Sequence, residues 1–151
     1  MTAGILVYMF KGAHVLLAQR KTGVSVDKLN APGGAVTFGE TALRGAARLV
    51  QQTVGVTPVL SEPLGEVLYH HPVHGNWKVT VFRTESFTGD PVETDTMVPV
   101  WVPVDAVPYD RMWAGDDEWL PYVVANEPFM AELWFDENDK IRQKDIQERK
   151  A

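Results

Sequence analysis

The sequence predicts a mixed α/β (α+β) fold in one compact domain. Short apolar runs of strand length, separated by turn-forming residues, recur along most of the chain. One segment instead carries apolar residues at helical spacing, at positions 43, 47, 50 and 54. The 151 residues and 45% hydrophobic content suit a single globular domain. We expect one domain over 1–151, with its core at 5–146 and a polar tail at 147–151.

The first half is predicted to hold a hairpin, a loop and the main helix. Residues 5–10 and 14–20 are apolar runs joined by a short turn, which is typical of two antiparallel strands. Residues 21–33 are rich in Gly, Ser, Asp, Asn and Pro and are predicted as a loop. The helix is expected to begin near Thr41, a capping residue, and to stop at Gly55.

The second half is predicted to be mostly strand. Apolar and β-branched runs bounded by turn residues predict strands at 56–60, 65–69, 77–86 and 98–102, with turns at Pro63, Gly75 and 89–91. A short helix is expected over 118–125. The last element is predicted as a hairpin of 129–135 and 140–146, turning at 137–139.

Charge and composition exclude several classes of protein. The net charge is −6, from 14 basic and 20 acidic residues, and no basic run exceeds two residues, which argues against binding to a nucleic acid duplex. There is no cysteine, so disulfide and thiolate chemistry are excluded. The apolar start of the chain is too short for a signal peptide or a membrane span. We expect a cytoplasmic protein with a small-molecule ligand and no membrane partner.

Residues 34–56 match the spacing of a motif used in phosphate chemistry. The pattern is G-x5-E-x7-R-E-U-x-E-E-x-G-U, in which U is aliphatic. Its other positions are matched by Gly34, Glu40, Arg48, Val50, Gly55 and Val56, whereas its last three glutamates are replaced by Leu49, Gln52 and Thr53. The segment resembles a degenerate box of the Nudix superfamily.

The three replaced positions define a helix face that in the Nudix family holds magnesium. Positions 49, 52 and 53 are spaced i, i+3 and i+4, so they share one side of a helix. Leucine, an amide and a hydroxyl offer no anionic ligand to a hard cation. The apolar stripe at 43, 47, 50 and 54 places Leu49 on the exposed side. We expect no metal site and no cofactor, with Mg²⁺ only if the chain is an active hydrolase.

The resemblance extends from residue 5 to residue 146 and is to one branch of the family. The segments 91–97, 112–113 and 116–121, together with Trp101, resemble the oxidised-purine nucleoside triphosphatases (8-oxo-dGTPase, MutT-like). This resemblance implies a Nudix-type α/β/α sandwich with a mixed β-sheet and a purine pocket. It also implies cleavage of a nucleoside triphosphate to a monophosphate and pyrophosphate.

The resemblance assigns base-binding roles to a few residues. Asn30 falls on the base-reading asparagine, whose amide offers a donor and an acceptor. The two adjacent aspartates of the branch fall on Gly115 and Asp116, or, with a shift of one residue, on Asp116 and Asp117. Trp113 falls on the tryptophan that stacks on the base.

Other predicted ligand-binding residues mark departures from the branch or belong to the loop. Val24 replaces a phenylalanine over the ring, and His70 and Trp77 replace smaller or apolar pocket residues. A further metal-binding glutamate of the branch is Thr96 here. Nearby Glu93 and Asp95 are expected to point away from the face of Thr96. The remaining predicted contacts are Gly33, Gly34 and Arg20.

Several residues also have a purely structural interpretation. Glu40 and Arg48 are expected to form a salt bridge that ties the loop to the helix, in preference to a role in chemistry. His70, His71 and His74 are not expected to share a metal ion, because neighbours on a strand face opposite ways. If a reaction takes place, the available acid–base groups are Glu40, Asp116, Asp117 and His70.

Two functions remain open at this point, and enzyme activity is undecided. The main hypothesis is a protein that binds a nucleotide, a nucleoside or another flat heterocycle in a purine-like pocket and has an inactive pyrophosphohydrolase site. The alternative is an active Nudix hydrolase that cleaves purine nucleoside triphosphates, oxidised ones included, through non-standard carboxylates. That alternative must supply the charge stabilisation that a cation usually provides.

Overall fold

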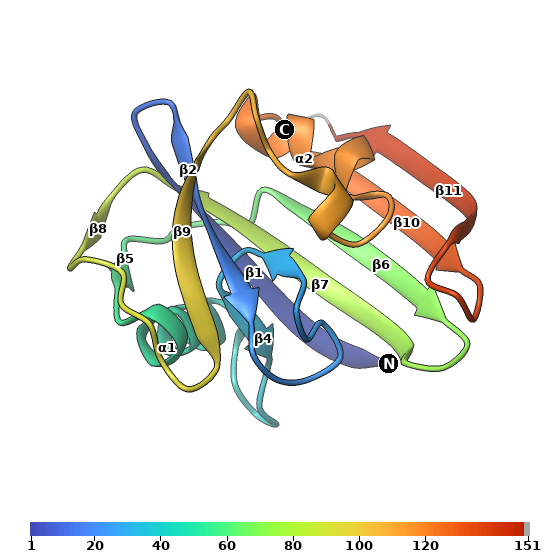
Figure 1. Cartoon of the computed structure of the whole chain (residues 1–151), viewed down its shortest axis with the longest axis horizontal. Helices are drawn as coiled ribbons and strands as arrows, with labels where there is room; N and C mark the ends of the chain where they lie inside the picture. The colour runs from blue at the N-terminus through green and yellow to red at the C-terminus, as the bar shows by residue number, and fades with distance from the viewer. Residues whose placement is uncertain (150–151) are drawn as a thin grey trace.

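The computed structural model describes residues 1–149 and contains one large mixed sheet (Figure 1). Within these residues nine strands form this sheet and two short strands form a second one. The strands of the large sheet are β1 (Thr2–Lys11), β2 (His14–Arg20), β3 (Leu29–Asn30), β4 (Gly33–Ala35), β6 (Gly65–His71), β7 (Gly75–Thr84), β9 (Met97–Pro103), β10 (Phe129–Phe135) and β11 (Ile141–Glu148). The small sheet pairs β5 (Thr57–Pro58) with β8 (Phe87–Thr88).

Strand β1 is the central strand of the large sheet. It runs parallel to β7 over Thr2 to Met9 and antiparallel to β4, and its far end forms the predicted hairpin with β2. Beyond β7 the order continues through β6 and β10 to the edge strand β11, while β9 and β3 flank β2. Parallel pairs β1–β7 and β6–β10 within an otherwise antiparallel sheet confirm the expected mixed sheet.

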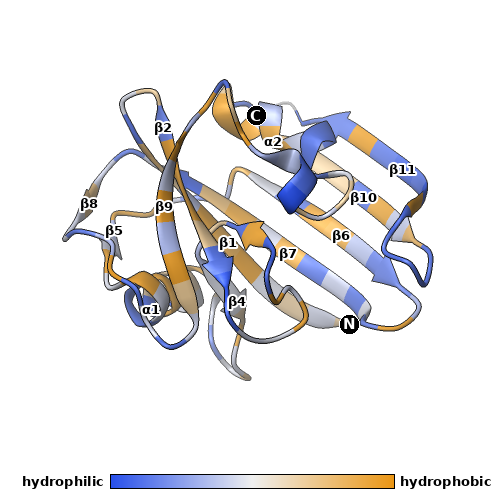
Figure 2. Ribbon diagram, in the orientation of Figure 1, coloured by the Kyte–Doolittle hydropathy of each residue, from blue (hydrophilic) through white to orange (hydrophobic). Residues whose placement is uncertain are grey.

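Alternate side chains of β1 pack into two separate hydrophobic cores, one on each face of the sheet. Leu6, Tyr8 and Phe10 pack on one face of the sheet, with helix α2 (Asp116–Val124), whereas Ile5 and Val7 pack on the other face, with α1 (Ala42–Val54). This is the period-two alternation of a strand buried on both sides. Apolar colour follows β1 in Figure 2, while much of the edge strand β11 is hydrophilic. The helices therefore cover opposite faces, which confirms the α/β/α fold class.

Helix α1 has the predicted ends but a different buried face. The Thr41 hydroxyl accepts a hydrogen bond from the Arg44 N–H at 3.2 Å, and Gly55 closes the helix with a left-handed φ of 74°. The buried face consists of Gly45, Ala46, Leu49, Val50, Thr53 and Val54. The expectation that Leu49 is exposed was wrong, since Leu43 is 46% exposed and Leu49 only 7%.

Smaller differences concern where elements begin and end. The run 56–60 forms only the two-residue strand β5, and Gly75, predicted as a turn, is the first residue of β7. Strand β11 continues to Glu148, so residues 147 and 148, predicted as tail, pair with β10. Residues 150–151 of the predicted tail lie outside the described part of the chain. Neither described helix is long and apolar enough to cross a membrane.

Candidate functional site

A cavity of about 280 Å³ opens on the α2 side of β1, between β7, β6 and the loop after β2. Its walls are largely aromatic, with contributions from Tyr69, His71, His74, Trp77, Trp113 and Phe135. Trp113 meets the Phe135 ring edge-on, with centroids 5.6 Å apart, and its indole N–H donates to Ser25 Oγ at 2.8 Å. This hydrogen bond fixes the predicted stacking residue against the loop, so the cavity has a rigid aromatic wall suited to a flat ring.

Six of the ten predicted ligand-binding residues line this cavity. They are Arg20, Val24, Asn30, Gly34, Trp77 and Trp113. Gly33 does not line it, because Gly33 packs directly against β1: a Cβ there would lie 1.9 Å from the Ile5 carbonyl oxygen. The role of this glycine is close backbone packing.

His70, predicted to bind the ligand, does not line the cavity. Its Nε2 lies 2.6 Å from Glu132 Oε2, and its ring stacks on Trp134, on the side of the strand that faces away from the cavity. Its neighbours Tyr69 and His71 line the cavity instead. Strand alternation separates His70 from both neighbours. The sequence alone did not indicate which of the two sets faces the ligand side, so Tyr69, His71 and Phe135 were missed.

The predicted aspartates lie behind the cavity wall or outside it. Asp116 is fully buried and does not line the cavity, while Asp117 is exposed. The Tyr69 hydroxyl donates to Asp116 Oδ1 at 3.0 Å, and the Trp119 indole N–H donates to the same oxygen at 3.2 Å. Burial raises the pKa of the Asp116 carboxyl to about 7, against the lowering effect of these two hydrogen bonds. Tyr69 lines the cavity whereas Asp116 does not, and the second carboxylate oxygen, Asp116 Oδ2, has no hydrogen-bond partner within residues 1–149.

Asn30 and Arg20 bring polar groups to the cavity. Asn30 Oδ1 accepts the Ala31 N–H at 2.9 Å, which leaves the amide Nδ2 without a partner among residues 1–149. Arg20, at the end of β2, has no ion pair or side-chain hydrogen bond with any described residue. Burial lowers the pKa of its guanidinium, although Tyr8 opposes this effect. Hydrogen-bond donors therefore reach the cavity unpaired.

His71, His74 and Asp139 gather at one end of the cavity. Their possible ligand atoms lie within 4.8 Å of one another. Within residues 1–149, no other group of three His, Cys, Asp or Glu side chains lies close enough together to share a metal ion. His71 Nδ1 accepts the backbone N–H groups of Val73 and His74, and its Nε2 lies 2.6 Å from Asp139 Oδ1. Since Nδ1 accepts, the proton is on Nε2 and points to the carboxylate.

This protonation pattern makes the His71 group a poor metal site. An ion on Nε2 would displace its proton, and the ring would then need a proton on Nδ1, facing two N–H donors. The group instead joins the β6–β7 turn to the β10–β11 turn by a hydrogen bond.

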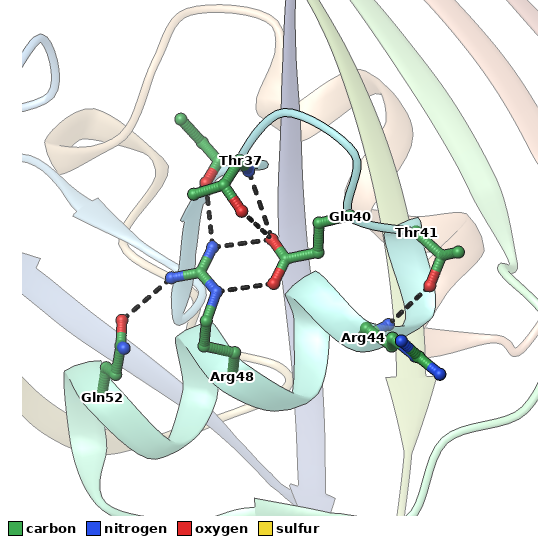
Figure 3. A network of polar contacts seen from close by, with 7 residues as sticks. Thr37, Glu40, Thr41, Arg44, Arg48 and Gln52 are labelled. Atoms are coloured by element: carbon green, nitrogen blue, oxygen red, sulfur yellow. Dashed lines mark hydrogen bonds and ion pairs between the residues drawn. The ribbon is translucent and has the colours of Figure 1, made fainter.

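The motif segment on the other face of the sheet is held by an internal network (Figure 3). The Arg48 guanidinium donates to both Glu40 oxygens, at 2.7 and 2.8 Å, and to Gln52 Oε1 at 2.9 Å. The bonds from Arg48, supplemented by Thr37, lower the pKa of Glu40 to about 2. The expected Glu40–Arg48 salt bridge is confirmed.

The positions of the missing glutamates do not offer the ligands that Mg²⁺ prefers. Leu49 is buried against Gly34, and the buried Thr53 hydroxyl donates to the Leu49 carbonyl at 2.6 Å. Thr96 shares a hydrogen bond with Thr94, which itself donates to the Thr53 carbonyl. None of these residues supplies a carboxylate, so this set does not fit a hard cation. Glu93 pairs with Lys21 at 2.5 Å.

Comparison with known proteins decides the family. A family model described as NUDIX domain matches residues 1–123. The chain belongs to the Nudix family. The oxidized purine nucleoside triphosphate hydrolase of Danio rerio is 31% identical over 137 residues, with 90% of this chain and 88% of the relative covered. The hydrolase of the same name from Mus musculus is 27% identical over the same shares.

Solved Nudix structures show the same fold. The MutT protein from Bacillus halodurans superposes with a TM-score of 0.84 over 97% of each chain, at 18% sequence identity. A MutT NUDIX hydrolase from Burkholderia pseudomallei gives a TM-score of 0.66 over 71% of this chain and 86% of its own, at 22% identity. These likenesses confirm the fold, while the family itself is shown by the matching family model and by the Danio rerio relative.

Proposed function

We propose that this Nudix protein binds a flat heterocyclic ligand, such as a nucleoside or nucleotide, in the aromatic cavity, and that it does so without Mg²⁺-dependent phosphate chemistry on helix α1. The observation that carries the proposal is the contrast between the unpaired donors Arg20 and Asn30 in the cavity and the carboxylate-free face of α1. The oxidised purine nucleotides named for the Danio rerio and Mus musculus relatives make a purine ring the first candidate.

Charge favours a ligand smaller than a triphosphate. The cations of residues 20–48 are Arg20, Lys21, Lys28, Arg44 and Arg48, and the Lys28 ammonium lies over the Trp113 ring, 4.6 Å from its centroid. Lys21 is paired with Glu93, and Arg48 with Glu40. In a chain of net charge −6, Arg20, Lys28 and Arg44 can neutralise only part of the roughly four negative charges of a bare triphosphate. We expect a nucleoside or monophosphate to bind at least as tightly as a triphosphate when divalent ions are absent.

Hydrolysis of oxidised purine nucleoside triphosphates is the second candidate, and the family relationship supports it more directly than it supports binding alone. The Danio rerio hydrolase shares 31% identity across 90% of this chain. This function would need carboxylates from outside the motif. Glu40 is bound to Arg48, Asp116 is buried behind Tyr69, and Asp117 lies outside the cavity.

One experiment separates the two candidates. The protein is incubated with ordinary and oxidised purine nucleoside triphosphates, with Mg²⁺ or Mn²⁺, and products are resolved by chromatography, while calorimetry measures binding of the matching nucleosides. Binding without turnover supports the proposal. Turnover that disappears in Trp113→Ala, which removes the stacking wall, and survives in the exposed-surface control Phe38→Ser, would establish the hydrolase.

A further inference from the structure

One wall of the cavity is contacted from behind by the turn between β10 and β11. His71, at the end of β6, lines the cavity and packs edge-on against Trp113, with ring centroids 6.0 Å apart and planes at 76°. The His74 ring lies 4.4 Å from the His71 ring and also meets Trp113 edge-on. Asp139 in the turn does not line the cavity, yet its Oδ1 lies 2.6 Å from His71 Nε2. The carboxylate therefore contacts this aromatic wall from outside the cavity.

Hydrogen bonds on both sides of the His71 ring fix how the ring is turned. Nδ1 accepts the Val73 N–H at 3.0 Å and the His74 N–H at 3.2 Å, so Nε2 carries the proton that points to Asp139. The torsion that rotates an imidazole is broad and roughly two-fold, so the ring has little orientation preference of its own. Turning the ring over would replace both nitrogens by carbons and break the bonds on both sides. Without Asp139, only the two backbone N–H groups would hold the ring by hydrogen bonds.

The β10–β11 turn presents Asp139 in an unfavourable backbone conformation. Its φ is 64°, in the left-handed region that favours glycine. The turn itself is held by Asp136, whose Oδ1 accepts the Asn138 N–H at 2.8 Å and the Lys140 N–H at 3.0 Å. Glycine would adopt the conformation of residue 139 more easily, but it would supply no carboxylate. The turn therefore does not require an acid at this position, and the contact with His71 is the interaction that explains it.

We propose that Asp139 is a positioning residue for ligand binding, which acts through His71 to keep the aromatic wall of the cavity in place for a flat ring. The inference rests on the proposed function and adds to it a residue outside the cavity. Side chains that are already ordered in the free protein do not have to be immobilised when a ligand binds, and this raises the affinity. When His71 and His74 lose their fixed orientation, we expect the affinity to fall about five- to tenfold.

Two substitutions at position 139 separate the carboxylate from the conformation of the turn. Binding is measured by calorimetry with whichever of guanosine and 8-oxoguanosine binds the natural protein more tightly. Asp139→Gly suits the left-handed φ and removes the acceptor, so the relief of backbone strain offsets the lost hydrogen bond. We expect the melting temperature of this variant to change by less than about 3 °C, while the nucleoside binds about five- to tenfold more weakly.

The matched variants keep the acceptor or the turn. Asp139→Asn retains an oxygen that can accept the His71 Nε2–H, so it should bind the nucleoside within about twofold of the natural protein. Glu137→Gln removes a carboxylate from an exposed position in the same turn and should leave the affinity unchanged. Rescue by asparagine, with loss in glycine at an unchanged melting temperature, is not expected of a residue that only stabilises the turn.

A measurement without ligand follows the wall directly. The amide protons of Val73 and His74 bond to His71 Nδ1, so their exchange with solvent reports whether the ring is held. We expect both amides to exchange about fivefold faster in Asp139→Gly than in the natural protein, and at the natural rate in Asp139→Asn.

The outcomes distinguish this inference from the proposed function. If the nucleoside binds Asp139→Gly as tightly as the natural protein, or binds both Asp139 variants equally weakly, the positioning role is overturned and heterocycle binding stands. Unchanged amide exchange in Asp139→Gly also overturns it. If no purine nucleoside or nucleotide binds the natural protein, the proposed function fails, while the exchange of the Val73 and His74 amides still decides whether Asp139 holds the wall.

Discussion

The cavity and the motif face of α1 differ in how their polar side chains are satisfied. On α1, Glu40, Arg48 and Gln52 bind one another, and Thr53 binds the helix backbone. In the cavity, the Arg20 guanidinium and the Asn30 amide group have no partner within residues 1–149. The first region is a closed network, while the second has open hydrogen-bonding capacity next to an aromatic wall.

This contrast indicates which of the two regions has room and hydrogen-bonding capacity for a ligand. The buried side-chain atoms without a partner in the described residues are the Tyr8 hydroxyl and Asp116 Oδ2, so the donors of Arg20 and Asn30 are reached by solvent in the cavity, where a ligand can replace the water. The polar groups of the α1 network bind one another, and the network stabilises the loop before α1. Matches to the family pattern at Glu40 and Arg48 are therefore explained by structure alone, whereas Arg20 and Asn30 are not.

The strongest test of the α1 side is Leu49→Glu. This change buries a carboxylate where a leucine fills the core, and we expect it to lower the free energy of unfolding by about 3 to 5 kcal/mol. The matched control is Gln52→Glu at an exposed position, expected within about 0.5 kcal/mol of the natural protein. Urea unfolding with and without Mg²⁺ measures both. If Mg²⁺ restored the stability of Leu49→Glu, this face of α1 would be able to hold a cation. That result would contradict the conclusion that only the cavity is open to a ligand.

The burial of Asp116 beside the cavity is tested by measuring how the free energy of unfolding depends on pH. Its carboxyl keeps its proton up to about pH 7 in the folded chain and loses it near 3.8 when unfolded, so between these values the folded state binds more protons. The stability that this carboxyl contributes is greatest below pH 3.8, falls as the pH rises above that value, and is lost once the pH has risen through about 7. Relative to Asp116→Asn, the natural protein should lose up to about 4 kcal/mol across this window. A stability difference that is flat with pH would contradict the burial of this carboxylate.

The smallest expected effect comes from two tyrosines in the same buried cluster. Tyr69→Phe removes the donor to Asp116, and we expect a loss of about 1 to 2 kcal/mol at pH 8, with a smaller loss at pH 5, where Asp116 is protonated. Tyr8→Phe is the matched change, because the buried Tyr8 hydroxyl has no partner within the described residues, and it should be neutral or stabilising. Equal losses at both positions would show that Tyr69 does not screen the carboxylate through its hydroxyl.

The sequence determined the elements whose signals are local. Helix α1 begins after Thr41 and ends at Gly55, as predicted, because helix capping depends on a few adjacent residues. The hairpin of β1 and β2 follows from two apolar runs around a short turn. The family resemblance singles out Asn30, Trp77 and Trp113, and all three line the cavity.

Only the tertiary structure decided which sides of these elements face one another. Leu49 is buried because α1 lies against β4 so closely that a Cβ on Gly34 would stand 3.1 Å from the Leu49 side chain. His71 rather than His70 faces the cavity because β6 is fixed in register between β7 and β10. Tyr69 covers Asp116, 47 residues away, and Asp139 meets His71, 68 residues away. Propensity and spacing act over a few residues, whereas these contacts depend on the pairing of strands that are distant in the chain.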